Sequence, residues 1–210
     1  MPVEQVRRQD RHERILHAAL EVFSTKGYRE AAVDDIAVEP DTSKGGVYFH
    51  FPNKQAIFRA LLDQMVGLLR TRIDAAIAAE TDPIGKADAA LRVVLQTFAS
   101  HRTLARLFLV EALGAGRDFH EHMVEIRGGF AELIRRHVDE AVQAGVIPPM
   151  DTAVASGVWF GALNEVVTTW VLSEPPGRLE DAYPTLRALL LRSVGVRVPL
   201  ISKVDDRAER

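Results

Sequence analysis

Two lysines and a tyrosine between residues 44 and 54 have the groups and the spacing needed to bind phosphate. Lys44 and Tyr48 are four residues apart, so a helix would place their ammonium and hydroxyl groups on one face. Lys54 adds a second cation a short distance along the chain. Two glycines in this segment have no side chain to keep a ligand away from the backbone. The candidate contacts from spacing alone are Ser43, Lys44, Gly45, Gly46, Tyr48 and Lys54.

Two short helices, predicted over residues 33–38 and 43–49, must position these groups. Residues 39–42 (Glu-Pro-Asp-Thr) form a turn between them, and a longer helix predicted over 10–26 precedes them. Two short helices joined by a tight turn and packed on a longer helix describe a helix-turn-helix, whose second helix can enter the major groove of DNA. Helix hairpins with a sharp turn also occur in protein cores, so this pattern alone leaves both interpretations open.

Apolar residues three and four apart recur along nearly the whole chain, which predicts an all-α protein of about nine helices. Asn53 and Asp82 are predicted to begin helices as N-caps, and Asp10 is predicted to begin the first helix with a capping box. Gly27 is predicted to end that helix in the left-handed conformation. The later helices are predicted over 53–79, from 82 through 98, and over 102–113, 118–144, 151–173 and 179–194.

Composition excludes several classes of protein. The 210 residues are 47% hydrophobic and carry a net charge of -3, which fits a globular chain with a full core. The chain has no cysteine, so disulfide frameworks, thiolate metal sites and iron–sulfur clusters are excluded. The polar N-terminal residues do not resemble a secretory signal, and no apolar stretch reaches the roughly 20 residues that a membrane span needs. We therefore expect a cytoplasmic protein without a membrane contact.

The larger C-terminal part has no catalytic signature. It contains no glycine-rich phosphate loop, no nucleophile elbow and no HExxH motif. Asp118, His122 and Glu125 share one helix face with the spacing of metal ligands, but a solvated face that suits the helix dipole is the better interpretation. No catalytic residue, metal or cofactor is predicted.

The N-terminal segment resembles the DNA-binding domain of the TetR family of bacterial transcriptional regulators. The resemblance covers about residues 11–60 and includes Ile15, Phe23, Gly27-Tyr28, Ile36-Ala37 and the segment YFHFPNK at 48–54. It implies a DNA-binding regulator, most simply a repressor, that binds a palindromic operator as a homodimer and is released by a small ligand. Residues that match DNA contacts of the family are Thr42, Ser43, Lys44, Tyr48, His50 and Lys54.

Three positions depart from the family pattern. Ala32 stands where a threonine or serine usually caps the second helix, which removes a cap worth about 1 kcal/mol. Asp41 replaces the usual glycine of the turn, and Gly46 replaces a side chain that often reaches a base. These departures leave the fold prediction intact and weaken any statement about the operator sequence.

The predicted domains are a helix-turn-helix domain at 1–52, with an arm at 1–9, a helical ligand-binding and dimerisation domain at 53–196 and a charged tail at 197–210. The helices at 151–173 and 179–194 are predicted to form the homodimer, because the first is apolar on nearly all sides. Gly157 and Gly161 would let a partner helix approach closely. An apolar seam is predicted at Leu186, Leu189, Leu190 and Val194.

Large apolar side chains and a few polar groups of the C-terminal helices are predicted to line a ligand pocket. We expect a mostly apolar effector with one polar head, such as a fatty-acyl derivative. Ordinary core packing is the alternative for the same residues, because aromatic stripes at helical spacing are common in cores. The pocket candidates are Phe98, Leu104, Phe108, Glu111, Met123, Arg127, Phe130, Trp159, Phe160 and Asn164.

Two other classes of function stay open at this point. One is a helical protein-interaction module that has lost DNA binding, which the substitutions at 32, 41 and 46 would allow. The other is a small helical enzyme, although repeated Glu-x-x-His pairs are missing. Retardation of the protein's own upstream DNA would separate a regulator from both.

Overall fold

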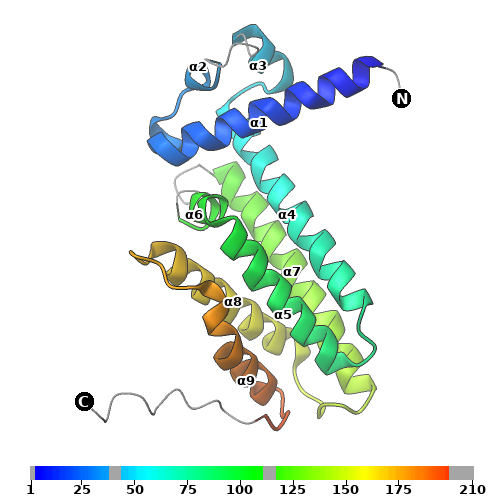
Figure 1. Ribbon diagram of the computed structural model, residues 1–210. Helices are drawn as coiled ribbons and strands as arrows, with labels where there is room; N and C mark the ends of the chain where they lie inside the picture. Colours follow the sequence, from blue (N-terminus) through cyan, green and yellow to red (C-terminus); the bar gives the residue numbers. More distant parts are fainter. Residues whose placement is uncertain (1–2, 38–43, 111–116, 199–210) are drawn as a thin grey trace, which may run out of the picture. The chain divides into compact units, whose positions relative to one another are not determined.

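The computed structural model describes residues 3–37, 44–110 and 117–198, and within these ranges it contains helices and no strand (Figure 1). The prediction of an all-α fold is confirmed. The elements are α1 (Val3–Glu30), α2 (Val33–Ile36), α3 (Lys44–His50), α4 (Lys54–Ala78), α5 (Pro83–Ser100), α6 (Arg102–Leu109), α7 (Arg117–Gln143), α8 (Thr152–Leu172), the short 3-10 helix η2 (Leu179–Ala182) and α9 (Tyr183–Ser193).

Three predicted helix starts are confirmed by the caps themselves. Asn53 Oδ1 accepts the Ala56 N–H at 2.8 Å, and Asp82 Oδ1 accepts the Gly85 N–H at 2.9 Å. Asp151 Oδ1 accepts the Val154 N–H at 3.0 Å. Each carboxylate or amide satisfies a backbone donor that the first helical turn leaves without a partner.

The first helix differs from its prediction at both ends. α1 begins at Val3, so Asp10 lies inside the helix, and the predicted capping box at Asp10 is wrong. Gly27 interrupts the helical geometry with φ 77° and ψ 158°. Its φ is positive, as predicted, but its ψ is extended rather than left-handed helical, and only glycine adopts this combination without strain.

The described residues divide into two compact units. Unit 1 comprises Met1–Leu68 and His101–Val124, and unit 2 comprises Leu69–Ser100 and Glu125–Arg210. Two helices, α4 and α7, contribute residues to both units. The predicted boundary between domains at 52 and 53 stays a prediction.

Unit 1 has an aromatic core centred on Phe58 of α4. Its side chain is 0% exposed, and its ring lies 4.4 Å from that of Tyr28 and 5.7 Å from that of Phe23, between centroids. Phe108 of α6 and Phe119 of α7 approach the same ring at 5.1 Å and 4.9 Å. Burial raises the pKa of the Tyr28 hydroxyl. Aromatic contacts therefore hold α1, α4, α6 and the start of α7 together.

Apolar clusters in the described part of unit 2 include the following two. The first has Leu69, Ile73 and Leu133 at its centre, with side chains of α5 packed around them. The second has Val138, Ala141, Ile147 and Val194 at its centre, and Trp159 of α8 packs against it. None of the helices in the described ranges combines the length and apolarity needed to cross a membrane.

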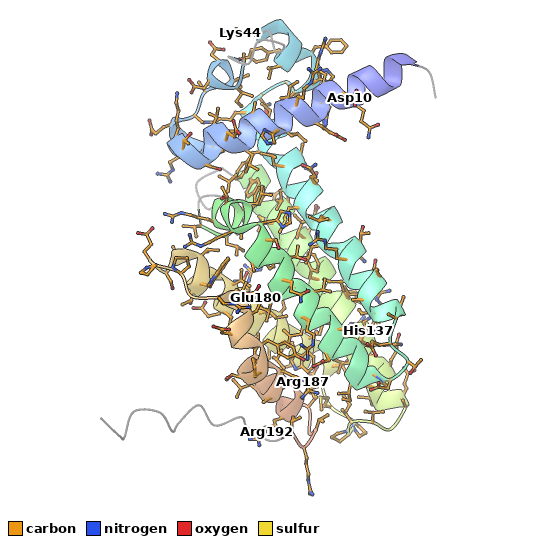
Figure 2. All side chains as sticks on the ribbon, viewed as in Figure 1. Asp10, Lys44, His137, Glu180, Arg187 and Arg192 are labelled. Atoms are coloured by element: carbon orange, nitrogen blue, oxygen red, sulfur yellow. The ribbon has the colours of Figure 1, made fainter. Side chains whose placement is uncertain are left out.

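Asp88 of α5 joins this helix to α9. It accepts hydrogen bonds from the Tyr183 hydroxyl and the Arg187 Nε–H, and from the Arg92 Nε–H at 3.2 Å. Partial burial raises the pKa of Asp88, but the three hydrogen bonds outweigh it and lower the pKa below its usual value. Burial and the bond to Asp88 together raise the pKa of Tyr183 to about 12. Figure 2 labels Arg187 on α9.

Replacing Asp88 with alanine should lower the free energy of unfolding by about 2 kcal/mol at pH 7, because Tyr183 and Arg187 lose a charged acceptor. A lowered folded-state pKa stabilises the protein above the unfolded pKa of about 4, and that contribution is lost as the pH falls through the folded pKa. The difference in free energy of unfolding between wild type and Asp88→Ala, measured by urea unfolding, should therefore shrink toward pH 3. Asp74→Ala, at an exposed position of α4, is the control and should change little.

Candidate nucleic-acid interface

The helix-turn-helix is held by apolar side chains that point inward from α2 and α3. Val33 and Ile36 of α2 are buried, and Val47 of α3 is 0% exposed. Figure 1 shows α2 and α3 on one side of α1, with α6 on the other. With Val47 anchored, four positions of α3 (Lys44, Gly45, Tyr48 and Phe49) are exposed, while Gly46 and His50 are half-buried.

The start of α2 replaces the missing side-chain cap of Ala32 in part. Asp35 Oδ2 accepts the Ala32 N–H at 2.9 Å, and Asp35 Oδ1 forms an ion pair with Lys26 Nζ at 2.7 Å. The hydrogen bond from Lys26, followed by that from Ala32, lowers the pKa of Asp35. One half of a capping box thus survives without a threonine or serine at position 32.

Lys44 and Tyr48 lie on the exposed face of α3, as predicted. Lys44 is labelled on α3 in Figure 2. Its Nζ donates to Asp34 Oδ2 of α2 at 2.7 Å, and this hydrogen bond raises the pKa of Lys44. Gly45 is exposed, and a Cβ atom built on it would meet no atom within 4 Å. The face therefore offers a cation, a hydroxyl and a bare stretch of backbone. Thr42 and Ser43, two further predicted contacts, lie outside the described residues.

Lys54 has contacts that the sequence did not suggest. Its Nζ donates to the carbonyl oxygens of Tyr28 at 2.7 Å, Arg29 at 2.9 Å and Ala31 at 2.8 Å. It also lies 4.6 Å from the centroid of the Tyr28 ring. An ammonium group has three donors, and all three are occupied here. In this structure Lys54 binds the last turn of α1 and Ala31 just after it, and its contact with DNA stays a prediction.

Sequence reasoning missed Phe49, which stands next to Tyr48 on α3. Its side chain is 70% exposed, against 45% for Tyr48. His50, a predicted contact, is half-buried, and its ring lies 5.4 Å from that of Phe49. Phe49 belongs to the motif segment, but an apolar residue in such a segment is usually part of the core. Only its exposed fraction identifies it as a candidate contact residue.

The predicted pocket residues fall into several clusters. In unit 1, Phe108 is part of the aromatic core. In unit 2, Phe98 and Phe130 pack around the first apolar cluster, and the Arg127 guanidinium lies 5.6 Å from the Phe160 ring. Trp159 packs in the second cluster and donates its Nε1–H to Ser193 Oγ at 3.1 Å. Leu104 and Met123 belong to unit 1 and Asn164 to unit 2; all three are half-buried, and Glu111 lies outside the described residues.

The predicted seam of α9 is wrong for three of its four residues. Leu186 and Leu190 are each 5% exposed and Val194 is 2% exposed, so all three belong to the core of a single chain. Leu189, at 56% exposed, is the one that faces outward. On α8, Gly157 and Gly161 are exposed, with open space where a Cβ would lie.

The face that carries His122 has a structural partner. His122 Nε2 lies 2.7 Å from Asp63 Oδ1 of α4, within unit 1. Among the described residues, no group of three or more acidic or histidine side chains could hold a metal ion. His122 therefore serves as a link between α4 and α7 in this structure.

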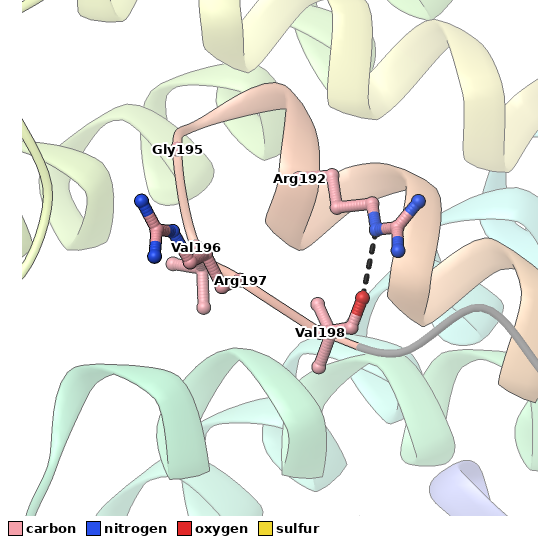
Figure 3. Close-up of a pocket in the computed structure, with 5 residues that line it drawn as sticks. All are labelled: Arg192, Gly195, Val196, Arg197 and Val198. Carbon is pink, nitrogen blue, oxygen red and sulfur yellow. Dashed lines mark hydrogen bonds between the residues drawn. The ribbon is translucent and has the colours of Figure 1, made fainter.

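An open surface pocket follows α9 (Figure 3). Its lining includes two arginines and two valines, and Arg192 Nε donates to the Val198 carbonyl at 2.7 Å. Figure 3 shows the guanidinium groups of Arg192 and Arg197 pointing in different directions. They do not converge on one anion, so we assign no ligand to this pocket.

The geometry of unit 1 is that of a helix-turn-helix DNA-binding protein, and the comparisons with known proteins agree. The model of bacterial regulatory proteins of the tetR family matches residues 15–61. The model of the YsiA-like protein C-terminal region matches residues 61–193. The chain belongs to the TetR family and is a DNA-binding transcriptional regulator.

Among its relatives is the fatty acid metabolism regulator protein of Bacillus subtilis (strain 168), 26% identical over 76% of this chain and 83% of the relative. The transcriptional regulator EthR of Mycolicibacterium smegmatis is 28% identical over 91% of this chain and 89% of its own length. The crystal structure of FadR from Bacillus subtilis in complex with stearoyl-CoA matches with a TM-score of 0.79 and 25% identity, covering 87% of this chain and 97% of that one.

Replacing Lys44 with alanine should weaken DNA binding and reduce its dependence on salt. Each lost phosphate contact lowers the slope of log affinity against log salt by about 0.9, so a dimer losing two contacts should lose about 2. Asp34 binds the same ammonium and would compete with phosphate for it, so Asp34→Ala should instead raise affinity. Fluorescence anisotropy over a salt series measures both effects. Lys86→Ala removes the same charge from unit 2 and should leave the slope unchanged; an unchanged slope in Lys44→Ala would contradict the assignment.

Proposed function

We propose that this regulator is a homodimeric repressor that leaves a palindromic operator when a long-chain fatty-acyl-CoA binds it. The observation that carries the proposal is the similarity to FadR crystallised with stearoyl-CoA, which extends over nearly the whole of both chains. The match to the C-terminal family model over residues 61–193 supports it, because the effector would bind in this part. The operator contacts would come from residues 42–50, within a DNA-binding domain that ends near residue 52.

The first apolar cluster of unit 2 is where we place the acyl chain. Leu69, Ile73 and Leu133 are buried there, and Phe98 and Phe130 are only partly buried. Partly buried aromatic side chains can change rotamer to admit an apolar chain at lower cost than close-packed ones. The cluster draws on α4, α5 and α7, so a ligand within it would bear on two helices that also contribute to unit 1.

Arg127 is our candidate for binding the polar end of the effector. Its side chain is exposed on α7, and its guanidinium lies 5.6 Å from the Phe160 ring. A guanidinium binds phosphate oxygens through two parallel hydrogen bonds, so it suits the phosphates of coenzyme A better than a small neutral head group.

The effector is tested with the wild-type chain and labelled DNA from upstream of its own gene. Stearoyl-CoA, stearate and coenzyme A are added separately, below the concentration at which the acyl chain forms micelles. Stearoyl-CoA should lower DNA affinity by about 5–150-fold, and DNA should weaken stearoyl-CoA binding by the same factor. Coenzyme A alone should have little effect, because it lacks the apolar chain.

Two variants sharpen this test. Arg127→Ala should lower the affinity for stearoyl-CoA without changing the affinity for stearate. Phe130→Trp should lower the affinity for both ligands, because the larger side chain would fill the apolar cluster. If stearoyl-CoA binds stoichiometrically and DNA affinity stays the same at saturation, the proposed effector is wrong. Failure of the wild-type chain to retard any of its upstream DNA would instead favour an interaction module.

The homodimer would form through α8 and the exposed part of α9. Val154 and Val158 are exposed on α8, on either side of the exposed Gly157, and Gly161 follows one turn later. Small residues four apart let two helices approach closely, and large apolar neighbours then lose their exposure to water. Leu189 is the residue of α9 that we add to this surface.

Replacing Leu189 with glutamate should convert the dimer to a monomer at micromolar concentration. The side chain is 56% exposed, so the charge costs the single chain little, whereas two copies would bury it at an apolar interface. Equilibrium sedimentation measures the result. Val124→Glu introduces the same charge at an exposed valine of α7 and should leave the dimer intact. A Leu189→Glu chain that remains dimeric would move the interface elsewhere.

A further inference from the structure

Phe49 is the most exposed of the large apolar side chains in the described residues. Its exposed fraction of 70% exceeds the 62% of Val154 on α8. Phe49 is exposed because Val47 fills the inward-facing position of α3 and the helix ends at His50. Large aromatic side chains are usually buried, so one that is exposed to water indicates a surface for binding another molecule.

The surroundings of the ring indicate what it faces. Gly45 lies one helical turn before Phe49 and has no neighbour within 4 Å of a built Cβ, so the surface beside the ring is bare. Lys44 and Tyr48 stand on the adjoining positions of the same exposed face. The ring is therefore part of the surface that carries the cation and the hydroxyl group assigned above to DNA.

The chemistry of the ring limits which base it can recognise. Phenylalanine has no donor or acceptor, so it cannot use the hydrogen-bonding pattern of the major groove. The 5-methyl group of thymine is the apolar group that base edges present there. We propose that Phe49 reads thymine through its methyl group, so that each operator half-site has a thymine facing this ring. This inference rests on the DNA contacts proposed for α3.

The experiment removes only the methyl group. Wild-type chain selects duplexes from a random pool, and each thymine of the selected duplex is then replaced in turn by uracil, which keeps the base pair and its hydrogen-bonding groups. At one position in each half-site, uracil should lower affinity about fourfold, and about fifteenfold when both half-sites are changed. Substitution at other thymines should have a smaller effect.

Phe49→Ala should bind the thymine and uracil duplexes with equal affinity, while Tyr48→Phe should keep the wild-type preference. Because Phe49 is exposed, the alanine variant should keep the wild-type melting temperature, which excludes misfolding as the cause. The inference would be overturned if the wild-type chain bound the thymine duplex and the fully uracil-substituted duplex with equal affinity. It would also be overturned if Phe49→Ala still preferred thymine to uracil. Binding of the pool without any selected sequence would also overturn it. A wild-type chain that binds no duplex would overturn the DNA-binding function itself.

Discussion

Replacing Lys54 with methionine should lower the free energy of unfolding by about 2–4 kcal/mol and lower DNA affinity by about tenfold, without changing the salt dependence of binding. Methionine keeps much of the apolar stem but loses the three hydrogen bonds to the carbonyls of Tyr28, Arg29 and Ala31. These bonds fasten the last turn of α1 and Ala31 to the start of α4, directly beyond α3. Loss of this attachment would let α3 leave its binding-competent position. The tenfold loss of DNA affinity corresponds to a tenfold smaller fraction of chains with α3 in that position.

Urea unfolding and a salt series of binding isotherms separate the two roles of Lys54. Lys54→Arg should recover part of the stability, because a guanidinium can still donate to two of the carbonyls. Lys44→Ala is the comparison, since it should flatten the salt dependence and leave stability almost unchanged. A flatter slope in Lys54→Met would mean that Lys54 leaves its carbonyl partners to contact phosphate in the complex, as its motif position implies.

Replacing Phe58 with alanine should cost about 3–5 kcal/mol, the largest effect that we expect on stability. The ring is fully buried and contacts aromatic rings of α1, α6 and α7. A typical domain is stable by only about 5–15 kcal/mol. Under the conditions in which half of the wild-type protein is unfolded, little of the variant should therefore remain folded. DNA binding should be lost with the fold, because α1 supports the helix-turn-helix.

Calorimetry and urea unfolding measure the effect of Phe58→Ala, and Phe49→Ala is its matched control. Both changes remove a phenylalanine ring from unit 1, but the exposed ring of Phe49 contributes little to packing, so its loss should change stability by less than about 0.5 kcal/mol. The pKa of Tyr28, raised by burial, should fall toward 10 in any Phe58→Ala protein that remains folded, because water would reach its hydroxyl group. An equal loss in both variants would contradict the aromatic core described for unit 1.

The sequence contained enough information for the helices and for much of the DNA-binding surface. Caps at Asn53 and Asp82 were predictable because their side chains bond to the backbone only three residues away. Lys44 and Tyr48 were predictable because a helical spacing of four places them on one face whatever the helix packs against.

Other features depend on contacts between distant residues. The apolar spacing of α9 identifies a buried face, but it does not say whether that face meets the same chain or a second copy, so the seam was wrong for Leu186, Leu190 and Val194. The carbonyl partners of Lys54 lie 23 to 26 residues away, and no local pattern reports them. One local signal was available, since a lysine in the first turn of a helix is disfavoured by the helix dipole and needs another source of stabilisation.

Two helices, α4 and α7, contribute residues to both compact units, and this sharing governs how the chain comes apart. A helix forms its hydrogen bonds cooperatively, so loss of one unit leaves both helices frayed in the unit that remains. The two units should therefore melt in one transition, with equal calorimetric and van't Hoff enthalpies. A small molecule bound by residues of either unit then raises the melting temperature of the whole chain. Thermal-shift screening thus detects an effector without revealing which unit holds it.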